Sequence, residues 1–240
     1  FSMKAFTSVR NHYQHFVYSV VASVVALMLT ISTFVALEPV VSRAQASVED
    51  TFIVEQTIDE EISFLVNAAD VSMVGTITGL TGGSATGSTY AVVRTNDPDG
   101  YNMTIEFPFA TTSGMQGNDT SSVINNYTPA TPGTADYDWI DNSAGGAAEF
   151  GYTIHASSSA DIDPAFLNTG TSCGGASFEE YQCWLNASIT PQTIINRTSG
   201  AASTGATTTI VFRVHAPDSP SPALEADTYT ATATLTATNN

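Results

Sequence analysis

The chain has 240 residues, of which 42% are hydrophobic, and a formal net charge of −17. After residue 46 it carries three arginines, no lysine and 22 acidic residues, a net charge of −19. Because binding to nucleic-acid phosphates or anionic lipid headgroups depends on basic side chains, this composition argues against nucleic-acid binding and peripheral membrane binding.

The first 46 residues have the order of a signal peptide. Lys4 and Arg10 precede an uncharged run over residues 16–37, and the small residues Ala44 and Ala46 frame a cleavage site. The uncharged run is also long enough to span a bilayer if it is not removed. The sequence therefore predicts that this segment is a signal peptide or an N-terminal membrane anchor, and that the rest is secreted or displayed on the cell surface.

Period-two alternation of apolar and polar residues predicts strands, since successive side chains of a strand face opposite sides of a sheet. In the clearest case, Tyr101, Met103 and Ile105 alternate with Asn102 and Thr104. Clear alternations cover residues 101–107, 150–155, 210–215 and 229–236, and weaker ones cover residues 51–58, 62–66, 71–78 and 89–95.

Many short strands with almost no helical periodicity predict a single all-β domain over residues 47–240. We expect an antiparallel β-sandwich, Ig-like or jelly-roll-like, preceded by the apolar helix. Short helical turns are expected only at residues 164–167 and 178–184. Residues 108–149 form a polar stretch much longer than ordinary connections, either a functional loop or a region that holds one or two edge strands around residues 123–127.

Within that stretch, residues 136–142 read Asp-Tyr-Asp-Trp-Ile-Asp-Asn. The carboxylates of Asp136, Asp138 and Asp141 are candidate ligands for calcium, which prefers oxygen ligands in flexible loops. The alternative is a polar surface loop without a ligand. Candidate rings for stacking on a sugar are those of Tyr137, Trp139 and Trp184.

Cys173 and Cys183 are the two cysteines of the chain. An even count in an exported protein predicts a disulfide, which for so short a loop contributes about 2–3 kcal/mol in the chain-entropy model. A zinc site would need two further ligands, and the histidines of the exported part, His155 and His215, fall on separate predicted strands.

The sequence contains no recognisable catalytic constellation. No serine lies in a Gly-x-Ser-x-Gly turn, and both His155 and His215 occupy the outward phase of their strands. The glycine-rich residues 79–87 lack the Gly-Lys-Ser/Thr ending of a phosphate-binding loop. We therefore expect no enzymatic activity and no cofactor apart from calcium, with a secreted hydrolase as a less favoured alternative.

The C-terminal run over residues 224–236 passes through Asp227-Thr228-Tyr229 into alternating threonine and apolar residues. It resembles the closing strand of the spore coat protein U-like family and related secreted bacterial sandwiches, although Asp227 stands where that family prefers glycine. The resemblance implies an Ig-like sandwich at the bacterial cell surface, assembled in some relatives into adhesive fibres by strand donation. Residues 47–58 would serve as a donor strand, or as the first strand of their own sheet.

These observations predict a non-enzymatic secreted or cell-surface structural protein, a fibre, pilus-like or coat subunit. Its partners would be further copies, bound through an edge strand or the N-terminal strand. The alternative is a carbohydrate-binding module that holds a polysaccharide with the aromatic and acidic loop.

Overall fold

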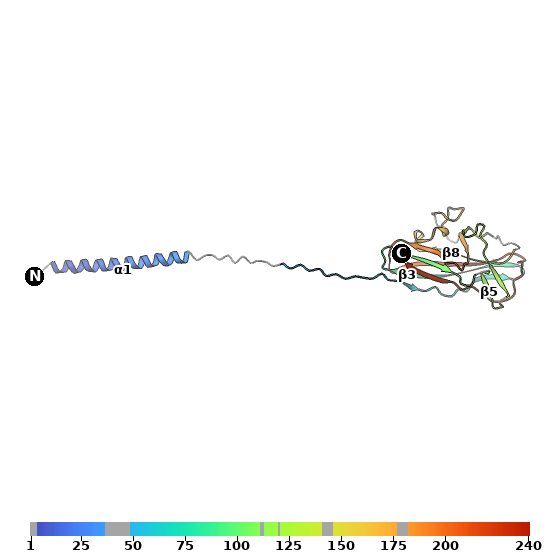
Figure 1. The fold of residues 1–240 in the computed structure, drawn as a ribbon, viewed down its shortest axis with the longest axis horizontal. Coiled ribbons are helices and arrows are strands. Elements are labelled where there is room, and N and C mark those ends of the chain that lie inside the picture. The colour runs from blue at the N-terminus through green and yellow to red at the C-terminus, as the bar shows by residue number, and fades with distance from the viewer. Residues whose placement is uncertain (1–3, 37–48, 111–112, 120, 141–145, 177–181) are drawn as a thin grey trace. The chain divides into compact units, whose positions relative to one another are not determined.

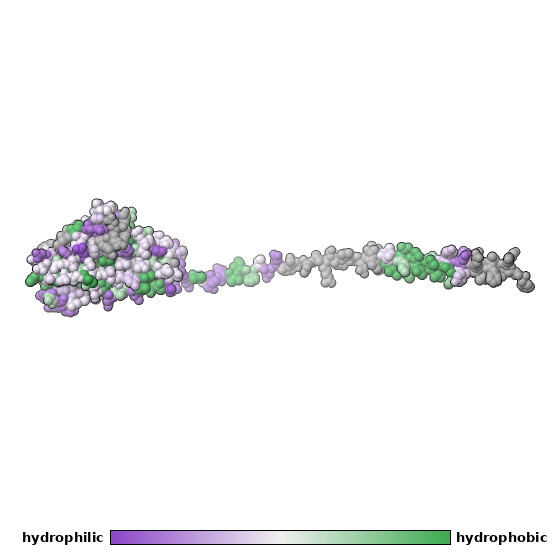
Figure 2. All heavy atoms as spheres, turned by 180° about the vertical axis from the view of Figure 1, so that it is seen from behind, coloured by the Kyte–Doolittle hydropathy of each residue, from purple (hydrophilic) through white to green (hydrophobic). Residues whose placement is uncertain are grey.

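The computed structural model describes residues 4–36, 49–110, 113–119, 121–140, 146–176 and 182–240. The chain divides into two units, Phe1–Gln56 and Thr57–Asn240. The first contains one helix, α1 (Lys4–Ala36), of which Tyr13–Thr33 is long and apolar enough to cross a membrane. Figure 2 shows the apolar surface of this helix. The predicted apolar helix is therefore present, and the predicted cleavage residues Ala44 and Ala46 lie outside the described residues.

The second unit is built from two β-sheets (Figure 1). Strand pairing in the larger sheet runs in the order β1-β3-β11-β8-β6-β5-β12, with β2 beside β3 and with β9 joining β7 to β8. The smaller sheet has the order β10-β4-β13. The larger sheet consists of β1 (Ile62–Val66), β2 (Val74–Thr78), β3 (Gly82–Thr95), β5 (Met115–Gly117), β6 (Val123–Asn126), β7 (Asp136–Tyr137), β8 (Glu149–Ala156), β9 (Cys183–Asn186), β11 (Ala201–Ala216) and β12 (Tyr229–Thr230), and the smaller of β4 (Tyr101–Glu106), β10 (Gln192–Arg197) and β13 (Thr234–Asn239).

An all-β sandwich with an N-terminal apolar helix was predicted, and the structure confirms it. The pairings are antiparallel with one exception among the described strands, the parallel pair β6–β8. The predicted edge strand around residues 123–127 is β6, and the predicted helical turn at residues 164–167 is the 3₁₀ turn Pro164–Phe166. The helical turn predicted at residues 178–184 was wrong at its C-terminal end, because Cys183 and Trp184 begin β9. Residues 178–181 lie outside the described residues.

Two strand predictions were also wrong, the first in part and the second entirely. Residues 229–236 do not form one strand, because Ala231, Thr232 and Ala233 separate β12 from β13. Residues 51–58 form no strand.

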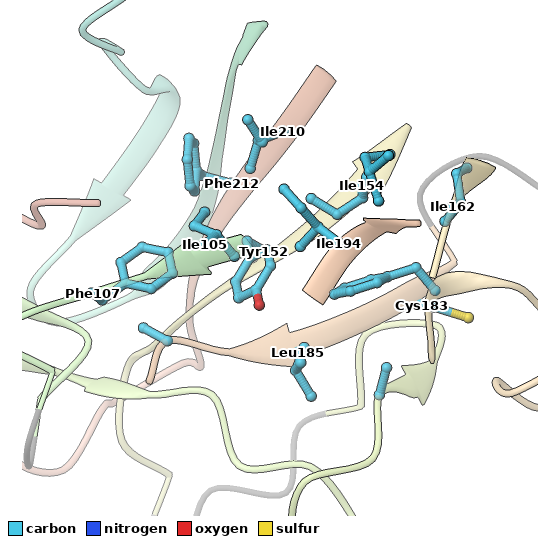
Figure 3. Close-up of a cluster of buried hydrophobic side chains, with 14 of the residues drawn as sticks. Ile105, Phe107, Tyr152, Ile154, Ile162, Cys183, Leu185, Ile194, Ile210 and Phe212 are labelled. Atoms are coloured by element: carbon cyan, nitrogen blue, oxygen red, sulfur yellow. The ribbon is translucent and has the colours of Figure 1, made fainter. Parts of the chain in front are cut away.

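The main core lies between the two sheets, where the apolar phases of the strands meet (Figure 3). Ile105 of β4 and Ile194 of β10 face Ile154 of β8 and Ile210 of β11, and none is more than 1% exposed. Burial of each such side chain contributes roughly 1.5–3 kcal/mol. Alternation alone therefore explains the inner faces of the sandwich.

A second, smaller cluster lies on the outer face of the larger sheet. Val211 of β11 is in the outward phase, yet it is only 6% exposed and packs with Tyr127, Trp139 and Trp184. The long polar stretch supplies the first two of these rings. The residues around Tyr127 and Trp139 therefore pack over the outer face of the sheet rather than forming a free loop.

The predicted disulfide is present: the sulfurs of Cys173 and Cys183 are 2.07 Å apart. Cys183 opens β9, and its Sγ also lies 3.5 Å from the carbonyl oxygen of Leu167. The bond therefore joins Cys173 to the start of β9 in the larger sheet.

Candidate functional site

The three predicted sugar-stacking rings do not form one exposed platform. Trp184 is 3% exposed, and its ring packs edge-on against Trp139, with ring centroids 5.3 Å apart. The ring centroid of Trp139 in turn lies 4.3 Å from that of Tyr127. Tyr137 is half-buried on β7, which pairs with β9. Because two of the rings pack against each other and one is buried, the platform proposed from the sequence has no flat open face.

Arg213 of β11 stacks on both tryptophans. Its guanidinium carbon lies 4.9 Å from the ring centre of Trp139 and 5.9 Å from that of Trp184. Burial lowers the pKa of Arg213 from its ordinary value. A guanidinium over an aromatic face contributes about 0.5–2 kcal/mol, so this contact ties the loop to the sheet.

The first predicted calcium ligand has a structural role. Asp136 is 8% exposed, and its Oδ2 accepts hydrogen bonds from the Tyr127 hydroxyl and the Ala130 N–H, both at 2.8 Å. Asp138 is exposed with φ 60°, and Asp141 lies outside the described residues. Among the described residues no group of three or more acidic, histidine or cysteine side chains is placed to hold a metal. Calcium binding by this loop stays a prediction.

The two histidines lie far apart along the β8–β11 pair. His155 is opposite Thr209, whereas His215 is opposite Glu149 at the other end of the same pairing. Both are half-buried. They do not meet in one cleft, so they do not form a shared acid–base pair.

A groove opens into the main core from one side of the sandwich. We call it the side groove: a cavity of about 640 Å³ between residues 68–73 and residues 228–235. Its floor is apolar and belongs to both sheets. The floor residues are Ile105, Phe107, Phe150, Ile210, Phe212 and Leu235.

Both margins of the side groove contain backbone without strand pairing. β1 and β2 pair with the same edge of β3, at residues 92–95 and 82–86, and residues 67–73 between them form no strand. In this margin the Ala69 N–H donates to the Thr89 hydroxyl at 2.8 Å. The opposite margin contains residues 231–233, which also form no strand. The groove is therefore flanked on two sides by backbone that forms no strand.

The segment before the sandwich, residues 52–58, exposes apolar side chains of the kind that would suit the apolar floor of the side groove. Phe52, Val54 and Ile58 are 82%, 83% and 81% exposed, and Ile53 is 92% exposed. Large apolar side chains are seldom left so exposed in an isolated domain unless they meet a partner.

Sequence reasoning singled out the exposed segment but missed the side groove. The signals were present: Ala68-Ala69-Asp70 separates the weak alternations over residues 62–66 and 71–78, and Ala231 and Ala233 supply small side chains where larger ones would fill the gap. Only the pairing of distant strands brings these two weak points together.

Comparison with protein-family models, with curated proteins and with solved structures found no match of this chain to any of them.

Proposed function

We propose that this chain is a non-enzymatic structural protein of the cell surface or the secreted fraction, whose sandwich polymerises by accepting an extended strand from a second copy. The observation that carries the proposal is the side groove, an apolar gap in the core flanked by residues 67–73 and 231–233, which form no strand, in a chain that also exposes large apolar side chains just before the sandwich. Addition of a strand at such a gap supplies main-chain hydrogen bonds and side-chain pockets together.

The length of the exposed segment suits the groove. Residues 52–58 in extended form span about 23 Å at roughly 3.3 Å per residue. The groove margins comprise residues 68–73 and 228–235, six and eight residues of chain. Phe52, Val54 and Ile58 share one face of the segment and would meet the apolar floor, while Glu55 and Thr57 would face water.

Chain connectivity favours a second copy over self-insertion. The side chain of Asn96 holds the approach to β1, because its Nδ2 donates to the Asp59 carbonyl oxygen (2.9 Å) and its Oδ1 accepts from the Glu61 N–H (2.6 Å). To reach the groove of its own sandwich, the chain would have to turn at residues 59–61 and place residues 54–58 beside the five residues of β1. Ile58 and Val54 would then lie outside the groove.

A contact of this kind joins two different surfaces of the same protein. Such head-to-tail contacts produce open filaments when the rotation between copies does not close a ring. A high negative charge on the exported part keeps the free subunits soluble before assembly.

The experiment is size-exclusion chromatography with light scattering on the chain from Ser47 onward, over a range of protein concentrations, with and without calcium. We expect polymers that grow with concentration and that disappear on deletion of residues 47–58. Phe52→Asp/Val54→Asp should abolish polymers in the same way, because these side chains would enter the groove.

Ile53→Asp is the matched control, since Ile53 is as exposed as its neighbours but lies on the opposite face of the segment. It should leave polymers intact. A monomer at every concentration, or equal loss of polymers in Ile53→Asp and in the double variant, would contradict the proposal.

A further inference from the structure

A second cavity, separate from the side groove, lies at a gap in the larger sheet. β6 and β9 both run along the same edge of β8 and end at adjacent positions: Asn126 of β6 is opposite Phe150, and Asn186 of β9 is opposite Gly151. Where the two strands diverge, a cavity of about 430 Å³ opens. We call it the amide crevice, after the three asparagines that line it, Asn125, Asn126 and Asn186.

The remaining wall of the amide crevice is a braced loop. It contains Pro129, Pro132 and Gly133, the last with φ 76°. The buried carboxylate of Asp136 accepts from the Ala130 N–H, and the Thr134 N–H donates to the Thr131 carbonyl oxygen at 3.0 Å. Two prolines and these backbone bonds fix the wall before any ligand arrives, which reduces the entropy cost of binding.

The hydrogen-bonding side chains that line the crevice are three amides and the hydroxyl-bearing residues Tyr127 and Thr128. The Oδ1 atom of Asn126 is buried and accepts no hydrogen bond from the described residues, although buried acceptors are nearly always paired. The Nδ2 of Asn186 donates one hydrogen bond, to the Ala187 carbonyl oxygen at 3.0 Å. An amide both donates and accepts, so it pairs well with a hydroxyl group, which does the same.

We propose that the amide crevice binds a neutral carbohydrate of one or two sugar units. Among the described residues no charged side chain lines the crevice, and the strongly acidic surface of the exported part disfavours anionic saccharides. The volume lies within the usual range of small-ligand sites, about 300–1,000 Å³. This assignment is independent of strand donation, and it differs from the sequence-based sugar site, whose three rings do not line the crevice.

The test is binding of the chain from Ser47 onward to an array of neutral oligosaccharides, followed by calorimetry with the disaccharide that gives the strongest signal. Asn126→Leu and Asn186→Leu keep the number of side-chain heavy atoms and remove the amide. Each should weaken binding roughly tenfold, as expected for one or two lost hydrogen bonds. Asn118→Ala, an exposed position outside the crevice, is the control and should bind as the unmodified chain does.

Thermal unfolding of the same variants separates binding from structure. Because Asn126→Leu removes a buried acceptor that has no donor among the described residues, it should unfold at the same or a higher temperature while losing affinity. Absence of binding to every neutral oligosaccharide on the array would overturn the proposal. Unchanged affinity in both leucine variants would overturn it as well.

Discussion

At the scale of single residues, Asp136 illustrates how one pattern can serve two purposes. An acidic residue in a flexible acidic loop predicts a cation ligand, but here the carboxylate accepts from the Tyr127 hydroxyl and the Ala130 N–H. A buried carboxylate that holds two donors organises the surrounding chain whether or not a cation is present. Asp136 thus connects the second cluster to the wall of the amide crevice.

Replacement of Asp136 by alanine should destabilise the protein by about 1–3 kcal/mol, because it leaves the buried Tyr127 hydroxyl and the Ala130 N–H without this acceptor. We expect the same loss in calcium and in chelator, measured by thermal unfolding. Asp138→Asn is the control, since Asp138 is exposed and asparagine tolerates its left-handed backbone. A stabilisation of the unmodified chain by calcium that disappears in Asp136→Ala would instead support the calcium prediction.

At the scale of elements, the part of the long polar stretch that carries Tyr127 and Trp139 packs on the outer face of β8 and β11. Gly151 of β8 makes this possible: a Cβ there would lie 3.0 Å from the Cβ of Tyr127 and 3.2 Å from Cζ3 of Trp139. Arg213 then covers the tryptophan rings from β11. The packing of Tyr127 and Trp139 on the sheet therefore depends on Gly151 of β8 and Arg213 of β11.

Arg213→Lys should lower stability by about 0.5–2 kcal/mol and increase the exposure of Trp139. Lysine keeps the charge but lacks the planar group that stacks on the rings. Denaturant unfolding and tryptophan fluorescence measure the two effects. Arg94→Lys is the matched control, because the Arg94 side chain is exposed and donates only to the Ser63 hydroxyl among the bonds described; equal losses in both variants would contradict a special role for stacking.

At the scale of the whole molecule, buried tyrosines occur in both clusters and make folding sensitive to alkaline pH. Burial raises the pKa of Tyr101 in the main core to about 12, from an ordinary value of 10.0. Burial also raises the pKa of Tyr127 in the second cluster and that of Tyr152 on β8. The fold therefore favours the neutral phenol at each of these positions.

Stability should be constant with respect to these groups below pH 10 and should fall as the pH rises from 10 towards 12. The unfolded chain loses phenol protons first, so it is favoured increasingly over this range. Chemical denaturation at a series of pH values measures the slope. Tyr101→Phe should flatten it, while Tyr90→Phe, at a half-exposed position, should leave it unchanged; an unchanged slope in Tyr101→Phe would refute the assignment.

The class of the fold and its local elements could be predicted from the sequence. The alternation through Tyr101, Met103 and Ile105 predicts the inner face of β4, and the uncharged run predicts α1. The pair of cysteines predicts the disulfide. These features depend on neighbours along the chain or on composition, so they can be recognised without knowledge of the fold.

What covers each face, and where the sandwich stays open, depends on contacts that the sequence pattern does not contain. Alternation places Val211 on the outward face of β11, but it cannot indicate that distant aromatic rings bury that face. It likewise gives residues 51–58 the pattern of a strand, although no strand forms there. The side groove arises because β1 and β2 leave part of the β3 edge without a paired strand, opposite the break between β12 and β13. Strand pairing and loop packing bring together residues that are far apart in sequence, and a local pattern of apolar and polar residues does not predict such long-range contacts.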